Sequence, residues 1–200
     1  MFETNKKLFR AILLPFIAFV LLIFAANISA YGMKEDAQAQ SLDSLSYFQS
    51  FSLRRFDQET GAPSEETFTE KDLASYKVVV FNGWGPWCTA CVGEMPELEA
   101  LAKEYESKGL LVVGIVAGYA TNPASNSDFS IQSVLDAYNI DYPILVGDDR
   151  FSAEVEPTMG GAYPGTWAVD AEGNLIEYVA GARNESGWRA YFDTWLEGAE

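Results

Sequence analysis

The sequence predicts an α/β fold with a central mixed β-sheet flanked by helices. Residues 78–81 and 110–116 are unbroken apolar runs rich in β-branched residues, which predict two buried strands with a helical segment between them. Residues 166–169 and 175–180 predict a hairpin around a turn that contains glycine, and a helix follows. Strand–helix–strand followed by hairpin–helix is the order expected of a mixed sheet covered by helices.

The first 31 residues predict a membrane segment. Lys6, Lys7 and Arg10 precede an apolar run that begins at Ala11, and about twenty helical residues span the roughly 30 Å of a hydrocarbon core. The three cations place residues 1–10 in the cytoplasm and send the rest of the chain across the membrane.

We therefore predict an uncleaved transmembrane anchor over residues 11–31, single-pass in the cell membrane, with an extracytoplasmic (periplasmic) domain. A cleaved signal peptide is the alternative, but its apolar region would usually be about 7–15 residues long and end at a better cleavage site than residues 28–30. Residues 32–47 are polar and predict a tether, which leaves the domain residues 48–200.

The domain is predicted to start with a hairpin. Residues 51–56 alternate between apolar and polar side chains, residues 61–67 (GAPSEET) predict the turn, and residues 69–74 predict one helical turn. The helix after the first buried strand is expected over residues 88–107, because Gly109 ends it.

Later elements are predicted by the same periodicities. Residues 131–138 carry the apolar face of another helix, residues 142–146 predict a third strand, and a short helix is expected near Phe151. The last helix presents aromatic and aliphatic side chains at helical spacing, which predicts core packing: Trp188, Tyr191, Phe192, Trp195 and Leu196.

Composition excludes several classes of function. The net charge of −16 disfavours nucleic-acid binding, because such a surface repels phosphate backbones. The chain contains no histidine, which excludes Cys/His zinc sites, Cys–His catalytic pairs and Ser–His–Asp triads. No metal site and no cofactor are expected.

The chain's two cysteines lie in the segment WGPWCTACVGEMPEL, residues 84–98. Cys88 stands where a buried strand turns into a helix, and the free N–H groups of a helix N-terminus favour thiolate over thiol. Cys91 lies one turn further into the helix, where it is able to attack a mixed disulfide formed at Cys88. This arrangement predicts a redox-active disulfide with both cysteines catalytic.

Three alternative roles for the cysteine pair remain open, and each is disfavoured by the sequence. A purely structural disulfide would close only a four-residue loop and stabilise the fold weakly. A zinc or copper site would have only two sulfur ligands. A peroxidatic site requires a threonine three residues before the cysteine, and Gly85 occupies that position.

Glu94 occupies a helix position where an apolar residue is expected. Cys91, Glu94, Leu98 and Leu101 recur at helical spacing and form one stripe that faces the core. Burial there raises the pKa of a carboxyl group, and an acid one turn from the resolving thiol is a candidate proton relay. The alternative is a glutamate that reaches the surface at the rim of the helix.

The segment NGWGPWCTACVGEMPEL resembles the thioredoxin superfamily, and more narrowly the membrane-anchored TlpA/ResA/DsbE-like thiol–disulfide oxidoreductases with their pattern W-C-x-x-C-x-x-E-x-P. Asn82, Pro96 and the segment YPGTWAVDAEGNL at residues 163–175 match the same family. The resemblance covers about residues 48–197 and implies a thioredoxin-like fold, in which the helix predicted at residues 131–138 is the family's inserted helix. The sequence departs from the family at Gly85-Pro86, at Gly165 and in the dipeptide Thr89-Ala90, and in this family the dipeptide helps to set the redox potential.

The resemblance also implies roles and partners. Pro164 is expected to follow a cis peptide bond, and Trp87, Tyr163 and Pro164 are expected to bind the substrate. Substrates would be exported proteins that contain cysteine, for example apocytochrome c before haem attachment, and a membrane thiol reductase would supply electrons. A disulfide-introducing oxidant is the alternative enzyme, and a non-catalytic, membrane-anchored binding module with a closed disulfide is the alternative of another class.

Overall fold

The computed structural model describes residues 22–23, 42, 45–121 and 127–199. Of the predicted anchor over residues 11–31 it describes only Leu22 and Ile23, which are helical; residues 1–10 and most of the predicted tether also lie outside the described residues. Within the described part of the chain, no helix is both long enough and apolar enough to cross a membrane.

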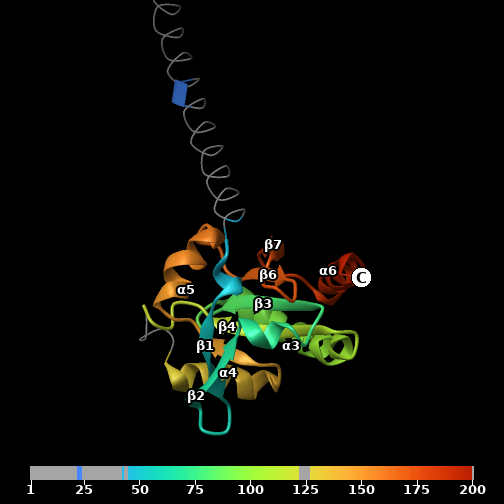
Figure 1. Ribbon diagram of the computed structural model, residues 1–200. Helices are drawn as coiled ribbons and strands as arrows, with labels where there is room; N and C mark the ends of the chain where they lie inside the picture. The colour runs from blue at the N-terminus through green and yellow to red at the C-terminus, as the bar shows by residue number, and fades with distance from the viewer. Residues whose placement is uncertain (1–21, 24–41, 43–44, 122–126, 200) are drawn as a thin grey trace, which may run out of the picture. The chain divides into compact units, whose positions relative to one another are not determined.

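One seven-stranded sheet organises the unit Leu42–Glu200, in the order β2-β1-β5-β4-β3-β6-β7 (Figure 1). The pairs β3–β4 and β4–β5 are parallel and the remaining pairs are antiparallel, so the sheet is mixed as predicted. The strands are β1 (Ser52–Asp57), β2 (Ala62–Thr69), β3 (Val78–Trp84), β4 (Leu110–Val116), β5 (Ile144–Val146), β6 (Gly165–Val169) and β7 (Leu175–Ala180).

Helices cover both faces of this sheet. One face packs against α3 (Thr89–Glu106), α4 (Asp128–Tyr138) and α6 (Glu185–Gly198). The other face packs against α2 (Glu70–Leu73), α5 (Asp149–Glu154) and the 3₁₀ turns η1 (Tyr47–Gln49) and η2 (Glu156–Met159). Figure 1 shows α5 on the opposite side of the strands from α3 and α4.

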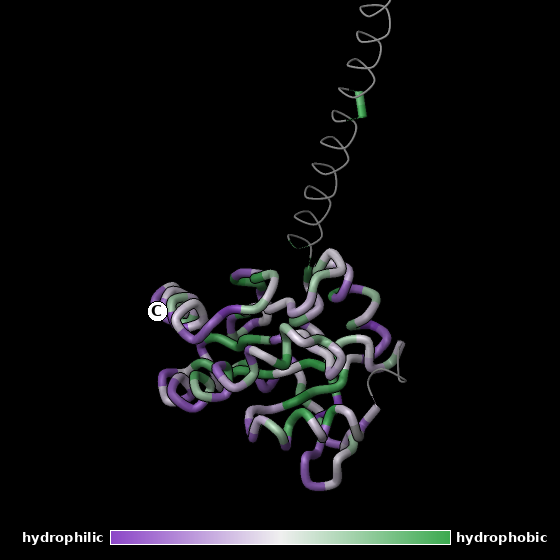
Figure 2. The backbone as a smooth tube through the Cα atoms, turned by 180° about the vertical axis from the view of Figure 1, so that it is seen from behind, coloured by the Kyte–Doolittle hydropathy of each residue, from purple (hydrophilic) through white to green (hydrophobic). Residues whose placement is uncertain are grey.

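The central strands β3 and β4 are apolar at almost every position because both of their faces are covered. All seven residues of each strand are buried. Val78 and Val80 face one core while Val79 and Phe81 face the other, as expected of alternating side chains in a strand. The hydrophobic stretches accordingly run through the middle of the domain, and the hydrophilic ones lie towards the outside (Figure 2).

The N-terminal hairpin is present, but its turn lies elsewhere than predicted. The segment APSEET belongs to strand β2, and the turn comprises residues 58–61, with Gly61 at a φ of 68°. The Asp57 carboxylate accepts the Glu59 N–H at 2.8 Å within this turn. Because β2 is an edge strand in which only Phe68 is buried, polar residues are tolerated there, and the polar composition of the segment gave no sign of a strand.

The structured unit also begins earlier than residue 48, at Leu42. Tyr47, assigned to the tether from the sequence, is buried with Phe48, and the Phe48 ring stacks on Phe81 of β3 with ring centroids 4.5 Å apart. Leu42 and Leu45 pack against the same core. The apolar side chains in this polar stretch are spaced so that they reach the sheet.

Candidate redox site

The two cysteines lie at the carboxyl end of β3, where the chain turns into α3. Cys88 is the N-cap of α3, and its Sγ accepts the Cys91 N–H at 3.2 Å. Cys88 and Cys91 form a disulfide with an S–S distance of 2.06 Å and Cα atoms 5.3 Å apart. The structure therefore holds the pair in its oxidised form, at the helix position that the sequence predicted.

The two cysteines differ in solvent exposure and in their surroundings. Cys88 is 7% exposed, whereas Cys91 is fully buried. On reduction, the Cys91 N–H and the positive end of α3 would both stabilise a thiolate on Cys88. This geometry suits Cys88 for attack on an external disulfide and Cys91 for the second, internal step.

Glu94 is buried, as its place in the helical stripe predicted, and is 2% exposed. Its Oε1 accepts the Asn82 side-chain N–H at 3.0 Å, and its Oε2 accepts the Arg183 backbone N–H and the Trp188 indole N–H, each at 3.0 Å. Burial raises the pKa of this carboxyl group, while these hydrogen bonds and the Arg183 charge lower it and offset part of the effect.

Asn82 links Glu94 to the strand that follows Pro164. Its amide nitrogen donates both to Glu94 and, at 3.0 Å, to the Thr166 hydroxyl on β6. Its Oδ1 is buried and accepts no hydrogen bond within the described residues. These hydrogen bonds thus connect α3, β3 and β6.

The predicted substrate-binding residues gather at the same end of the sheet. The Tyr163–Pro164 peptide bond is cis, as the family resemblance implied, and the Pro164 carbonyl accepts the Gly181 N–H at 2.8 Å. Trp87, next to Cys88, is 47% exposed and meets the Tyr163 ring edge-on, with centroids 4.9 Å apart. Burial, together with the charge of Glu156 and a hydrogen bond to it, raises the pKa of Tyr163.

The structure explains one departure of the sequence from the family pattern. A Cβ atom at Gly85 would lie 2.6 Å from the Trp87 indole nitrogen, because the Trp87 ring lies against the backbone at this position. Gly85 therefore allows Trp87 to adopt the position in which it contacts Tyr163.

Sequence reasoning missed the donors that α6 and its preceding loop provide. Trp188 was predicted to be a core residue, and it is buried, but its indole N–H also serves Glu94. The Arg183 N–H comes from the loop between β7 and α6. These residues lie 89 and 94 positions from Glu94, and no local pattern connects them.

Comparison with known proteins places this fold and site in a family. The model of the AhpC/TSA family matches residues 48–178. The chain belongs to the AhpC/TSA family. It is 25% identical over 122 residues to the thiol-disulfide oxidoreductase ResA of Bacillus thuringiensis, covering 60% of this chain and 64% of that protein, slightly less than two thirds of its length. It is 26% identical over 181 residues to ResA of Oceanobacillus iheyensis, covering 90% and 84%.

A solved structure agrees at the level of the fold. The thiol:disulfide interchange protein of the thioredoxin family from Chlorobium tepidum superposes with a TM-score of 0.56 at 21% identity, covering 74% of this chain and 93% of that one. The domain of this AhpC/TSA family member is therefore thioredoxin-like, as predicted.

Proposed function

We propose that this AhpC/TSA family member is a thiol–disulfide oxidoreductase that reduces disulfides in exported proteins. The observation that carries the proposal is the Cys88–Cys91 disulfide at the N-terminus of α3 with the buried Glu94 one turn beyond it. The name shared by the similar ResA proteins supports the same reaction class. The reductive direction rests on the sequence resemblance to membrane-anchored reductants.

The proposed reaction runs through one mixed disulfide. The Cys88 thiolate attacks a substrate disulfide, so that a Cys88–substrate bond forms, the substrate S–S bond breaks and the departing thiolate takes up a proton. Cys91 loses its proton and attacks the Cys88 sulfur, which re-forms the Cys88–Cys91 bond and releases the second substrate thiolate. Two electrons pass to the substrate, and a membrane thiol reductase would restore the dithiol.

Glu94 would serve this cycle as a proton relay. It stands one helical turn after Cys91, and its raised pKa brings it closer to neutral pH, where a proton acceptor and donor works best. In the second step it would take the Cys91 proton and return it to the departing thiolate.

Trp87, Tyr163 and Pro164 would bind the segment that carries the substrate cysteine. Trp87 and Tyr163 form an aromatic rim beside Cys88, and an extended substrate segment would lie along the backbone at Tyr163.

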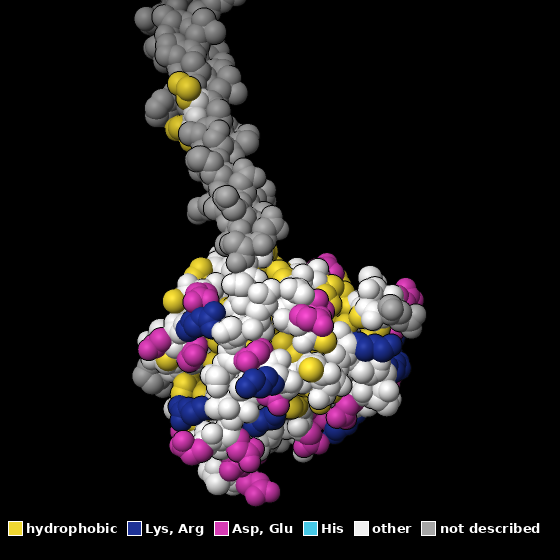
Figure 3. Space-filling view, viewed as in Figure 1, with side chains coloured by type: hydrophobic (Ala, Val, Ile, Leu, Met, Phe, Trp, Pro, Cys, Tyr) yellow, Lys and Arg dark blue, Asp and Glu magenta, His cyan; other side chains and the backbone are white. Residues whose placement is uncertain are grey.

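On the face of the domain seen in Figure 3, Lys and Arg side chains lie among Asp and Glu side chains, so no patch of a single charge sign dominates that face. The proposed substrates are exported proteins with exposed cysteines, such as apocytochrome c.

The midpoint potential of the Cys88–Cys91 pair should lie at roughly −230 mV or below, in the range of reducing thiol proteins. Equilibration with glutathione or thioredoxin buffers, followed by alkylation and mass spectrometry, measures it. A value near about −120 mV would instead support a disulfide-introducing oxidant. A binding module would be indicated if Cys88 resisted alkylation after mild reduction and insulin disulfides were not turned over.

We also propose that residues 11–31 anchor the protein in the cell membrane with its domain outside. Full-length protein should remain in the membrane fraction after a carbonate wash, and added protease should digest the domain in intact spheroplasts. A soluble mature protein that begins near Tyr31 would show that the segment is a cleaved signal peptide.

A further inference from the structure

Both donors to Glu94 Oε2 come from one part of the chain, separate from the strand and helix that carry the cysteines. The Trp188 indole N–H belongs to α6, and the Arg183 N–H belongs to the loop just before it. Among the residues that the structure describes, only the contact from Asn82 to Oε1 originates within the β3–α3 unit itself.

The position of the Trp188 indole is fixed by packing and by polar contacts. Trp188 is fully buried, and its ring lies 6.1 Å from that of Phe192 between centroids. Asn184 caps α6 by accepting the Gly187 N–H at 2.9 Å, which holds the loop that contains Arg183.

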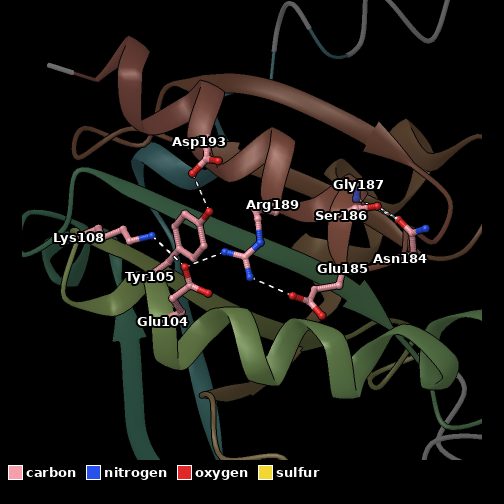
Figure 4. A network of polar contacts seen from close by, with 9 residues as sticks. All are labelled: Glu104, Tyr105, Lys108, Asn184, Glu185, Ser186, Gly187, Arg189 and Asp193. Carbon is pink, nitrogen blue, oxygen red and sulfur yellow. Dashed lines mark hydrogen bonds and ion pairs between the residues drawn. The ribbon is translucent and has the colours of Figure 1, made fainter.

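Polar side chains also bind α6 to α3, as Figure 4 shows. Arg189 of α6 contacts Glu104 of α3 at 2.7 Å and Glu185 at 2.9 Å. The Tyr105 hydroxyl donates to Asp193 at 2.6 Å. The donor at Trp188 is therefore held in place relative to the helix that carries Glu94.

We propose that Trp188 is a positioning residue of the redox site, and that its indole N–H sets the proton affinity of Glu94 and thereby the pH range in which the thiols exchange. This inference rests on the proposed function and extends it from the cysteine helix to α6. Its role exceeds core packing, because a buried carboxylate needs hydrogen-bond donors. Trp188 supplies one of the three N–H groups of the described residues that donate to Glu94.

The sign of the effect follows from the groups around Glu94. An N–H donor favours the charged carboxylate, as does the Arg183 guanidinium, whereas burial favours the protonated acid. The phenol of Tyr142, which precedes β5, also interacts electrostatically with Glu94, and the two cysteines are bound to each other in the oxidised form. Removing the indole donor should therefore raise the proton affinity of Glu94, about tenfold for one hydrogen bond to a charged group.

The test is a titration of the Glu94 carboxyl in the oxidised protein, where the cysteines carry no thiol proton. Carbon-13 NMR of labelled glutamate, assigned with Glu94→Gln, follows it in wild type, in Trp188→Phe and in protein with benzothienylalanine at position 188. The last replacement keeps the shape of the indole and removes only its N–H. Both replacements should increase the proton affinity about tenfold, so the part of the exchange pH profile that reports deprotonation of Glu94 should move to higher pH.

Trp195→Phe is the matched control. Trp195 is also buried on α6, and its indole N–H donates to a glutamate, Glu177, at 2.8 Å. It should leave the Glu94 titration unchanged. Unchanged titration with benzothienylalanine at position 188 would overturn the proposal, even in a protein that reduces insulin normally. Absence of insulin reduction by wild type would instead reject the proposed function.

Discussion

Cys88→Ser is expected to reduce turnover of insulin disulfides to the uncatalysed level. The reaction starts with a thiolate, and a serine hydroxyl does not ionise near neutral pH. Cys91→Ser should also lose multiple turnover, but for another reason: it completes the first attack and then accumulates a mixed disulfide that nothing resolves. Steady-state insulin reduction combined with non-reducing gels distinguishes the two variants.

Ser107→Ala is a suitable control for these two substitutions. Ser107 is exposed at the C-cap of α3, at the end of the helix away from the cysteines, so the turnover of this variant should stay close to that of wild type. Equal accumulation of mixed disulfides by Cys88→Ser and Cys91→Ser would contradict the division of roles between the cysteines.

Glu94→Gln is expected to flatten the pH dependence of stability in the oxidised protein. The pKa of Glu94 is raised in the folded state, so folding favours its protonated form. That contribution is complete below the unfolded pKa of about 4.3 and disappears as the pH rises through the higher folded pKa. Over this window the stability of wild type should fall relative to the variant, whose amide does not titrate.

The same variant should change the chemistry of the reduced protein. A charged Glu94 disfavours a second negative charge on the neighbouring sulfur, so its removal should move the midpoint of thiolate absorbance to lower pH. Denaturation curves at several pH values and thiolate absorbance in the ultraviolet provide the two measurements. Curves that superimpose on those of wild type in both experiments would show that Glu94 is not coupled to the thiols.

The elements that depend on local periodicity were predictable from the sequence. Strand β4 has the predicted bounds, and α3 begins one residue after the predicted start, with Cys88 as its cap. Glu94 was placed in the core by its spacing from Cys91 and Leu98, and all three residues are buried. Helical spacing fixes which side chains share a face, so the burial of Glu94 follows from neighbouring residues.

Features that depend on distant contacts were not predictable in this way. The edge strand β2 tolerates a polar sequence, because only one of its residues is buried, and this sequence resembled a turn. Trp188 has the spacing of any core aromatic, and only the packing of α6 on α3 brings its N–H to Glu94. The hydrogen-bond donors to Glu94 Oε2 therefore depend on contacts between distant parts of the sequence.

The most direct test of the redox site is the location of a trapped substrate. Cys91→Ser protein, reduced and mixed with a disulfide-bonded peptide, should give a complex in which mass spectrometry of its proteolytic fragments finds the peptide cysteine joined to Cys88. Cys88→Ser should give little complex under the same conditions, because Cys91 is fully buried. A complex formed equally well at Cys91, or none in either variant, would contradict the assignment of Cys88 as the attacking residue.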